Sequence, residues 1–235
     1  MLRITHNVRD VTLSLRRLSN EQLPAVTVGA LNQTAYDALD AVKEEMVRVF
    51  DRPTRWTLNA LMVWRATTDN PKAVVQERPS VGRRHYLKVQ AHGGQRPETG
   101  VERLLKSNLA YSGFIAAVTP AKGARLDRYG NWSPGQRNQL LSGVGAQMDR
   151  AANTTAASRR RNKGRATFFV PKEGARLSPG VYSRKGDKIE KVVHFTRSMP
   201  TYEKRIDLPS VIERKAAEVF ETHFALRLDH ALRIA

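Results

Sequence analysis

An apolar repeat over residues 21–50 constrains the fold more than any other feature of the sequence. Side chains recur there at spacings of three, four or eight residues, which places them on one side of an α-helix. The recurring positions are Val26, Ala30, Ala38, Val42, Met46 and Val49, and Leu31, Ala35 and Leu39 widen the stripe. The pattern predicts a long amphipathic helix. It ends at Arg52-Pro53, because proline disfavours a helical conformation in the residue before it.

Helical spacing predicts a second amphipathic helix from Pro209 to about Leu232. Its apolar positions are Ile212, Ala216, Val219, Phe220, Phe224 and Leu228. Between these two helices, residues with high β-propensity and intervening turn signals predict strands. We expect a hairpin at 56–67 and 72–78, and further strands at 85–90, 166–170, 180–184 and 191–197, with a turn at Gly186-Asp187. Helices at both ends around antiparallel strands predict an α+β fold.

Two shorter helices are expected between the strands. One covers 98–109, where leucine and valine form a single apolar face. The other begins at Ser133-Pro134, because serine is a favoured N-cap and proline suits the first turn of a helix. The stretch 113–133 is rich in turn-forming residues and is predicted to be irregular.

The predicted organisation is one α+β domain over residues 1–235. In it, an antiparallel sheet packs against the long N-terminal helix and the C-terminal amphipathic helix, and extended loops or arms project from this core. Residues 85–150 are expected to form an insertion. Residues 150–165 are expected to form a basic flexible arm, because this segment has no apolar side chain larger than alanine to anchor it.

The charge of the chain is strongly positive and unevenly distributed. The sequence has 40 Lys and Arg against 22 Asp and Glu, a formal net charge of +18. Residues 150–205 hold 15 of the basic residues and 4 of the acidic ones, whereas 206–235 hold 4 basic and 5 acidic residues. Such an excess favours polyanionic or acidic partners and opposes self-association unless assembly neutralises it.

Composition also excludes several classes of protein. The chain has no cysteine, so disulfides, thiolate metal sites and cysteine nucleophiles are excluded. No apolar run approaches the roughly 18–20 residues that span a bilayer, and the N-terminus lacks the apolar region of a signal peptide. We therefore expect a protein made in the cytoplasm, with no membrane partner.

No catalytic or metal-binding constellation stands out. His223 and His230 are seven residues apart, which is about 10 Å along a helix and too far for two ligands of one zinc ion. Asp127, followed by Gly130-Asn131, fits either a nuclease-like motif or a turn in which Asp and Asn bond their own backbone, and the turn is favoured. No phosphate-binding loop, dinucleotide fingerprint or serine-nucleophile motif is present. We expect no enzyme, no catalytic residue, no metal and no cofactor.

A run of cations is the strongest local signal. Its members are Arg159, Arg160, Arg161, Lys163 and Arg165. They fit contact with phosphates, because guanidinium groups bind phosphate oxygens in pairs and release counterions. They also fit a solvated arm that keeps the subunit soluble, or docking on an acidic ring of another protein. Phe168 and Phe169 are close enough to stack on bases, but their setting in a strand indicates the core.

Three stretches resemble the minor tail protein Z family of tailed bacteriophages, also called tail completion or neck proteins. The first comprises 30–39, 52–59 and 70–75; the second is 125–142; the third comprises 168–170, 177–184 and 192–197. They are spread over residues 30–197, which is most of the length of the chain. The segment 85–150 is larger than its counterpart in the lambda-type protein.

The resemblance implies a structural virion protein that forms a ring at the head–tail junction or the upper tail. It implies a homo-oligomer, of six or twelve copies, beside adjacent neck, portal-adaptor or tail proteins. Non-specific contact with genomic DNA is a further expectation. The main alternative is a basic nucleic-acid-binding protein involved in DNA packaging or genome retention; a nuclease or peptidase is a third.

Overall fold

A computed structural model describes residues 12, 16, 18–81, 87–109, 115–172 and 174–234. The chain divides into two compact units. Unit 1 comprises Met1–Ala91 and Lys204–Ala235, and unit 2 comprises His92–Glu203. Unit 2 is thus longer than the predicted insertion over 85–150. The division into two units also differs from the predicted single domain. The reason is that the strands after residue 165 pair within unit 2.

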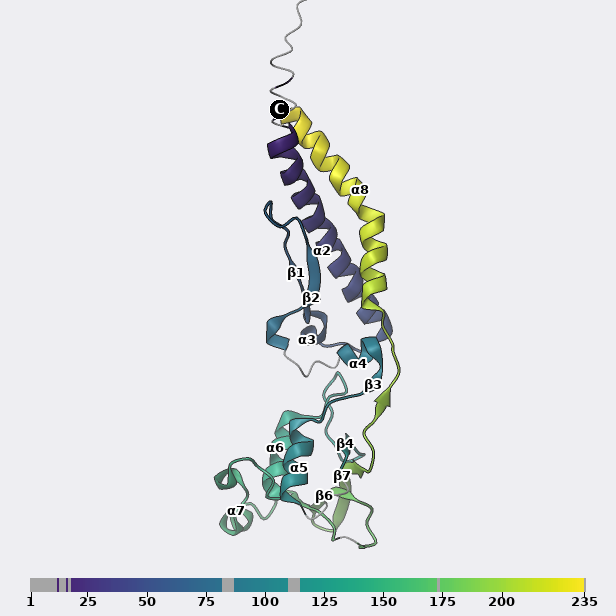
Figure 1. Cartoon of the computed structure of the whole chain (residues 1–235). Helices are drawn as coiled ribbons and strands as arrows, with labels where there is room; N and C mark the ends of the chain where they lie inside the picture. Colours follow the sequence, from purple (N-terminus) through teal and green to yellow (C-terminus); the bar gives the residue numbers. More distant parts are fainter. Residues whose placement is uncertain are drawn as a thin grey trace, which may run out of the picture. The chain divides into compact units, whose positions relative to one another are not determined.

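Unit 1 is built on two long helices, and both were predicted. α2 (Leu23–Val49) continues from a π-helical turn, η1 (Leu18–Gln22), and α8 (Leu208–Ile234) lies beside it (Figure 1). The predicted stripe of α2 is buried: Val26, Ala30, Ala35, Ala38, Leu39, Val42 and Met46. A hydrogen bond joins the helices, with His223 Nε2 lying 2.7 Å from Asp37 Oδ2. The predicted packing of the sheet against helices is present here through a hairpin.

That hairpin consists of β1 (Leu61–Trp64) and β2 (Val74–Glu77), which pair antiparallel as predicted. The residues just before it form a short helix, α3 (Arg55–Leu58), because Thr54 Oγ1 accepts a hydrogen bond from the amide of Thr57. After η2 (Pro79–Val81), the predicted strand at 85–90 is wrong over its described part: α4 (Leu87–His92) is helical. Leu87 and Ala91, one turn apart, both enter the core of unit 1.

Unit 2 contains a four-stranded antiparallel sheet in the order β4-β7-β6-β5. Its strands are β4 (Ala117–Pro120), β5 (Thr167–Phe169), β6 (Gly180–Lys185) and β7 (Lys188–Thr196). A second pair joins β3 (Gly94–Gln95) to β8 (Thr201–Tyr202). The three later strands and the turn at Gly186 were predicted. β4 was not, since it lies in the stretch predicted to be irregular.

Helices cover the sheet and complete the core of unit 2. These are α5 (Gly100–Asn108) and α6 (Pro134–Gly143), followed by η4 (Arg150–Ala152) and α7 (Ala156–Arg161). Leu105 of α5 and Leu140 of α6 pack with Val181 and Val193 of the sheet. Residues 150–165, which were predicted to form a basic flexible arm, contain η4 and α7. Thr155 caps α7 by accepting a hydrogen bond from the amide of Ser158.

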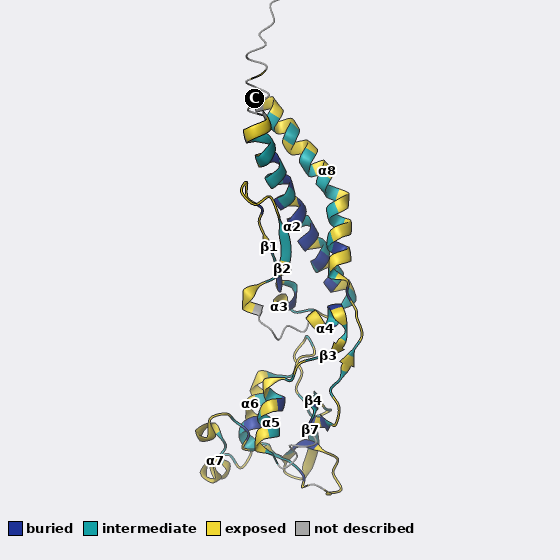
Figure 2. Ribbon diagram, in the orientation of Figure 1, coloured by how far each residue is buried: buried dark blue, intermediate teal, exposed yellow. Residues whose placement is uncertain are grey.

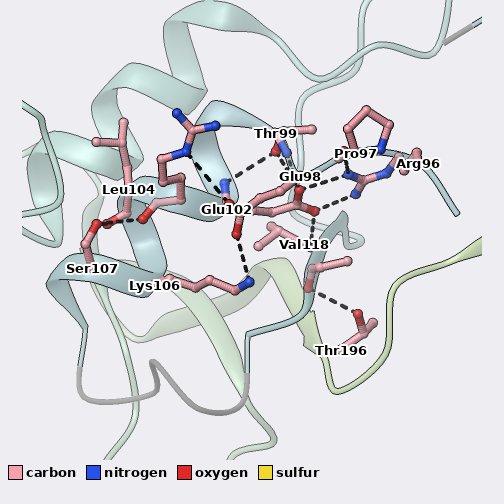
Figure 3. Close-up of polar contacts among 12 residues, drawn as sticks. Arg96, Pro97, Glu98, Thr99, Glu102, Leu104, Lys106, Ser107, Val118 and Thr196 are labelled. Carbon is pink, nitrogen blue, oxygen red and sulfur yellow. Dashed lines mark hydrogen bonds and ion pairs between the residues drawn. The ribbon is translucent and has the colours of Figure 1, made fainter. Parts of the chain in front are cut away.

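A buried carboxylate ties α5 to the sheet (Figure 3). Glu102 is fully buried and accepts hydrogen bonds from the Arg96 guanidinium, from Thr99 N and Oγ1, and from Val118 N of β4. Burial raises the pKa of Glu102, but these hydrogen bonds outweigh it and bring the pKa to about 2. The carboxylate is therefore ionised in the folded protein and joins three segments of unit 2.

Candidate functional site

A hollow of about 910 Å³ lies within unit 2 and is referred to below as the basic groove. Its walls come from three stretches of chain: 123–147, which includes α6; 154–168, which includes α7; and 183–190, the turn end of the β6–β7 hairpin. The sheet and the helices that cover it bring these stretches together. The groove is thus a product of the tertiary fold.

Positive charge dominates the lining. The cations that line the groove are Arg125, Arg159, Arg165, Lys185 and Lys188. The single acidic residue among those lining it is Glu190, whose Oε1 lies 2.9 Å from Lys188 Nζ. The remaining lining is mainly amide, hydroxyl and glycine. Such a surface attracts anions. Its cations come from several stretches of the sequence, so one basic run alone does not account for them.

Gln136 of α6 holds the wall that carries Arg125. Its side-chain oxygen accepts hydrogen bonds from the Arg125 amide at 2.7 Å and from Trp132 Nε1 at 2.9 Å, and its side-chain nitrogen donates to the Gly123 carbonyl at 2.9 Å. Gln136 is buried. One amide therefore satisfies three partners and positions the backbone of Arg125 at the groove.

The segment that contains α7 is fastened to the end of α6. Thr154 N donates to the Ser142 carbonyl at 3.0 Å, and Ser142 Oγ donates to the Ala152 carbonyl at 2.8 Å. Arg159 Nη2 lies 3.4 Å from the Gly143 carbonyl, where the negative end of the α6 dipole favours a cation. These contacts explain why a segment without large apolar side chains has a defined place.

The predicted candidate residues divide between the groove and the surface outside it. Arg159 and Arg165 line the groove, whereas Arg160, Arg161 and Lys163 do not. The sequence reasoning missed the cations that other stretches contribute: Arg125, Lys185 and Lys188. The one signal that pointed to two of them was the basic excess over 150–205. For Arg125, only the tertiary fold supplies the connection.

The two phenylalanines near the groove are engaged in packing. Phe168 lines the groove but lies against Gly143, so closely that a Cβ at Gly143 would be 3.0 Å from Phe168 Cβ. Phe169 stacks on Tyr182, with ring centroids 5.8 Å apart. Both rings are half-buried. Their packing fits the interpretation that this strand belongs to the core.

Asp127, the candidate catalytic residue, has a structural role in a turn. Asp127 Oδ1 accepts hydrogen bonds from the amides of Tyr129 and Asn131, each at 2.9 Å, and Gly130 has a φ of +81°. The predicted turn is confirmed, and the hydrogen bond from Asn131 is the main cause that lowers the pKa of Asp127. Among the described residues, no group of three or more His, Asp or Glu could hold a metal ion. His6 and His85 lie outside them.

The chemistry of the residues that line the groove indicates what it can bind. Within the described parts of the chain, no helix is both long enough and apolar enough to cross a membrane. No family model, curated protein or solved structure matches this chain.

Proposed function

We propose that this protein is a non-enzymatic structural subunit of a tailed-bacteriophage virion. It assembles as a homo-oligomeric ring at the head–tail junction or in the upper tail, after synthesis in the host cytoplasm. The role comes from the resemblance to the minor tail protein Z family in the three stretches that begin at residues 30, 125 and 168. The α+β fold and its two long helices fit that role.

The observation that carries the proposal is that α8 leaves apolar side chains exposed beyond the core of unit 1. On α8 that core extends only as far as Ile212. Beyond that point Phe220 and Phe224, whose ring centroids are 6.0 Å apart, are half-buried. Leu226 is 64% exposed and Leu232 52% exposed. Most of α8 is exposed or half-buried in Figure 2. Among the described elements, α2 is the main packing partner of α8.

A second copy of the chain is the partner that the charge favours. The segment 206–235, which contains α8, holds 4 basic and 5 acidic residues and is near neutral. Residues 150–205 instead carry a large positive excess, so copies that met through unit 2 would repel one another. Association through α8 buries apolar side chains without that cost. Neighbouring neck, portal-adaptor or tail proteins then contact the ring.

One alternative is favoured by a specific observation. The basic groove would also suit a nucleic-acid-binding protein of DNA packaging or genome retention that is not a structural subunit. The two functions differ in whether the protein is a component of the finished particle. A structural subunit is present in every purified particle at a fixed copy number, whereas a packaging factor is absent or present in variable amounts.

Native mass spectrometry of the full chain tests the ring. We expect six or twelve copies for the wild type and smaller species for the double variant Leu226→Glu, Leu232→Glu, which places charges in the proposed contact. Ser210→Glu is the control, because Ser210 is exposed on the same helix but lies about four turns before Leu226. A wild-type chain that stays monomeric and is missing from purified particles would contradict the proposal.

A further inference from the structure

We infer that the basic groove binds the phosphodiester backbone of nucleic acid and offers no stacking site to its bases. This site lies wholly within unit 2. It does not depend on the proposed ring, which uses α8 of unit 1. The inference rests on which side chains line the groove, on how they are held, and on which side chains are absent from its lining.

The lining fits an extended polyanion better than a small molecule. Small-molecule pockets of about 300–1,000 Å³ are mostly apolar and aromatic, with few polar groups. Here five cations and several amides and hydroxyls line a hollow of about 910 Å³. Arg125, Arg159 and Lys185 come from three different walls. A ligand with repeated negative charges would contact all three, whereas a single phosphate would leave most of the cations without a partner.

The same lining has no exposed aromatic ring on which unpaired bases could stack. Proteins contact phosphate and sugar through Arg, Lys, Ser, Thr, Asn and Gln, and bind unpaired bases by stacking on exposed aromatic rings. Ser158, Asn162 and Gln139 line the groove together with the cations. Phe168 is the one aromatic residue among those lining it, and its ring is packed against α6 at Gly143. The groove therefore offers contacts to a backbone and no stacking platform.

Equilibrium DNA binding, measured by fluorescence anisotropy over a salt series, tests the inference. The groove variant carries Arg125→Gln, Arg159→Gln and Arg165→Gln. The control carries Arg160→Gln, Arg161→Gln and Lys163→Gln, which removes the same charge from the same region but outside the groove. Both are compared on duplexes of two unrelated sequences and on a single strand of equal length.

We expect the groove variant to lose about thirtyfold in affinity for DNA, and its salt slope to fall by about 2–3, because each lost phosphate contact lowers the slope by about 0.9. The control should lose less than about threefold. The two duplexes should bind equally. Equal losses in both variants, a strong preference for one sequence, or competition by polyglutamate as effective as that by DNA of equal charge would overturn the inference. The last result would instead indicate an acidic protein partner.

A variant that is expected to gain affinity for DNA distinguishes a change in the groove from misfolding. Glu190→Gln removes the carboxylate from the lining and frees Lys188, so we expect DNA binding to tighten about threefold at low salt. Unchanged or weaker binding would count against the groove. DNA binding should also persist in the Leu226→Glu, Leu232→Glu variant, so that loss of the ring and loss of the groove are measured separately.

Discussion

At the scale of single residues, Glu102 is the side chain on which unit 2 depends most. It is 0% exposed and accepts hydrogen bonds from Arg96, Thr99 and Val118 (Figure 3). Glu102→Gln leaves the guanidinium of Arg96 without its anionic partner. Because breaking a buried ion pair costs about 3–5 kcal/mol, we expect the free energy of unfolding to fall by about 3 kcal/mol at pH 7. Urea unfolding measures this. Glu203→Gln, an exposed carboxylate of the same unit, should change it by less than about 0.5 kcal/mol.

The same carboxylate predicts a pH dependence. Its pKa falls from 4.5 to about 2 on folding, so its stabilisation is complete above pH 4.5 and is lost as the pH falls from 4.5 towards 2. The wild type should lose about 3 kcal/mol over that window through this group. Glu102→Gln should lose correspondingly less. Parallel loss in the two proteins, measured by urea unfolding at pH 7 and pH 2.5, would show that other carboxylates dominate.

The candidate site shows which of its residues could be predicted from the sequence. Arg159 and Arg165 could be predicted because they belong to a dense basic run. Their neighbours Arg160 and Arg161 share that run but lie outside the groove, since a short helix turns successive side chains in different directions. Arg125 could not be predicted, because its place depends on contacts between α6 and the loop before it.

At the scale of elements, the β6–β7 hairpin depends on a glycine at the start of β6. Gly180 has a φ of +156°, and a Cβ there would overlap the carbonyl oxygen of Val193 on β7. Gly180→Ala must separate the strands at the centre of the sheet, so we expect a loss of about 2–3 kcal/mol in the free energy of unfolding. Gly164→Ala is the control, because nothing lies within 4 Å of a Cβ there. Equal stability of the two variants would contradict this role.

Elements with a long periodic pattern were predictable, whereas the short elements α4 and β4 were not. α2 and α8 have apolar positions repeated over many turns, and α5 carries a capping box between Thr99 and Glu102. α4 and β4 have six and four residues, too few for a period to be distinguished. Their structure is set by partners distant in sequence: β4 pairs with β7, and Leu87 of α4 packs into the unit 1 core.

At the scale of the whole molecule, the two units divide the charge and the apolar surface between them. Unit 2 holds half of the 40 basic residues but about a third of the 22 acidic ones. The uncovered apolar side chains of α8 belong to unit 1. Unit 2 begins with the glycine- and proline-containing segment 92–97, but its extent could not be predicted, because β3 pairs with β8 far along the chain, where unit 2 ends. The division predicts that self-association and DNA binding are separable.

Expressing the two units separately tests whether self-association and DNA binding are separable. The Arg205 amide donates to the Gln90 carbonyl at 2.7 Å, so the ends of unit 1 lie close enough for a short Gly-Ser linker to replace 92–203. We expect this shortened chain to unfold cooperatively in urea and to self-associate without binding DNA. Residues 92–203 alone should bind DNA with the salt slope of the full chain and remain monomeric. If self-association required 92–203, or if DNA affinity followed unit 1, the roles assigned to α8 and to the basic groove would have to be exchanged.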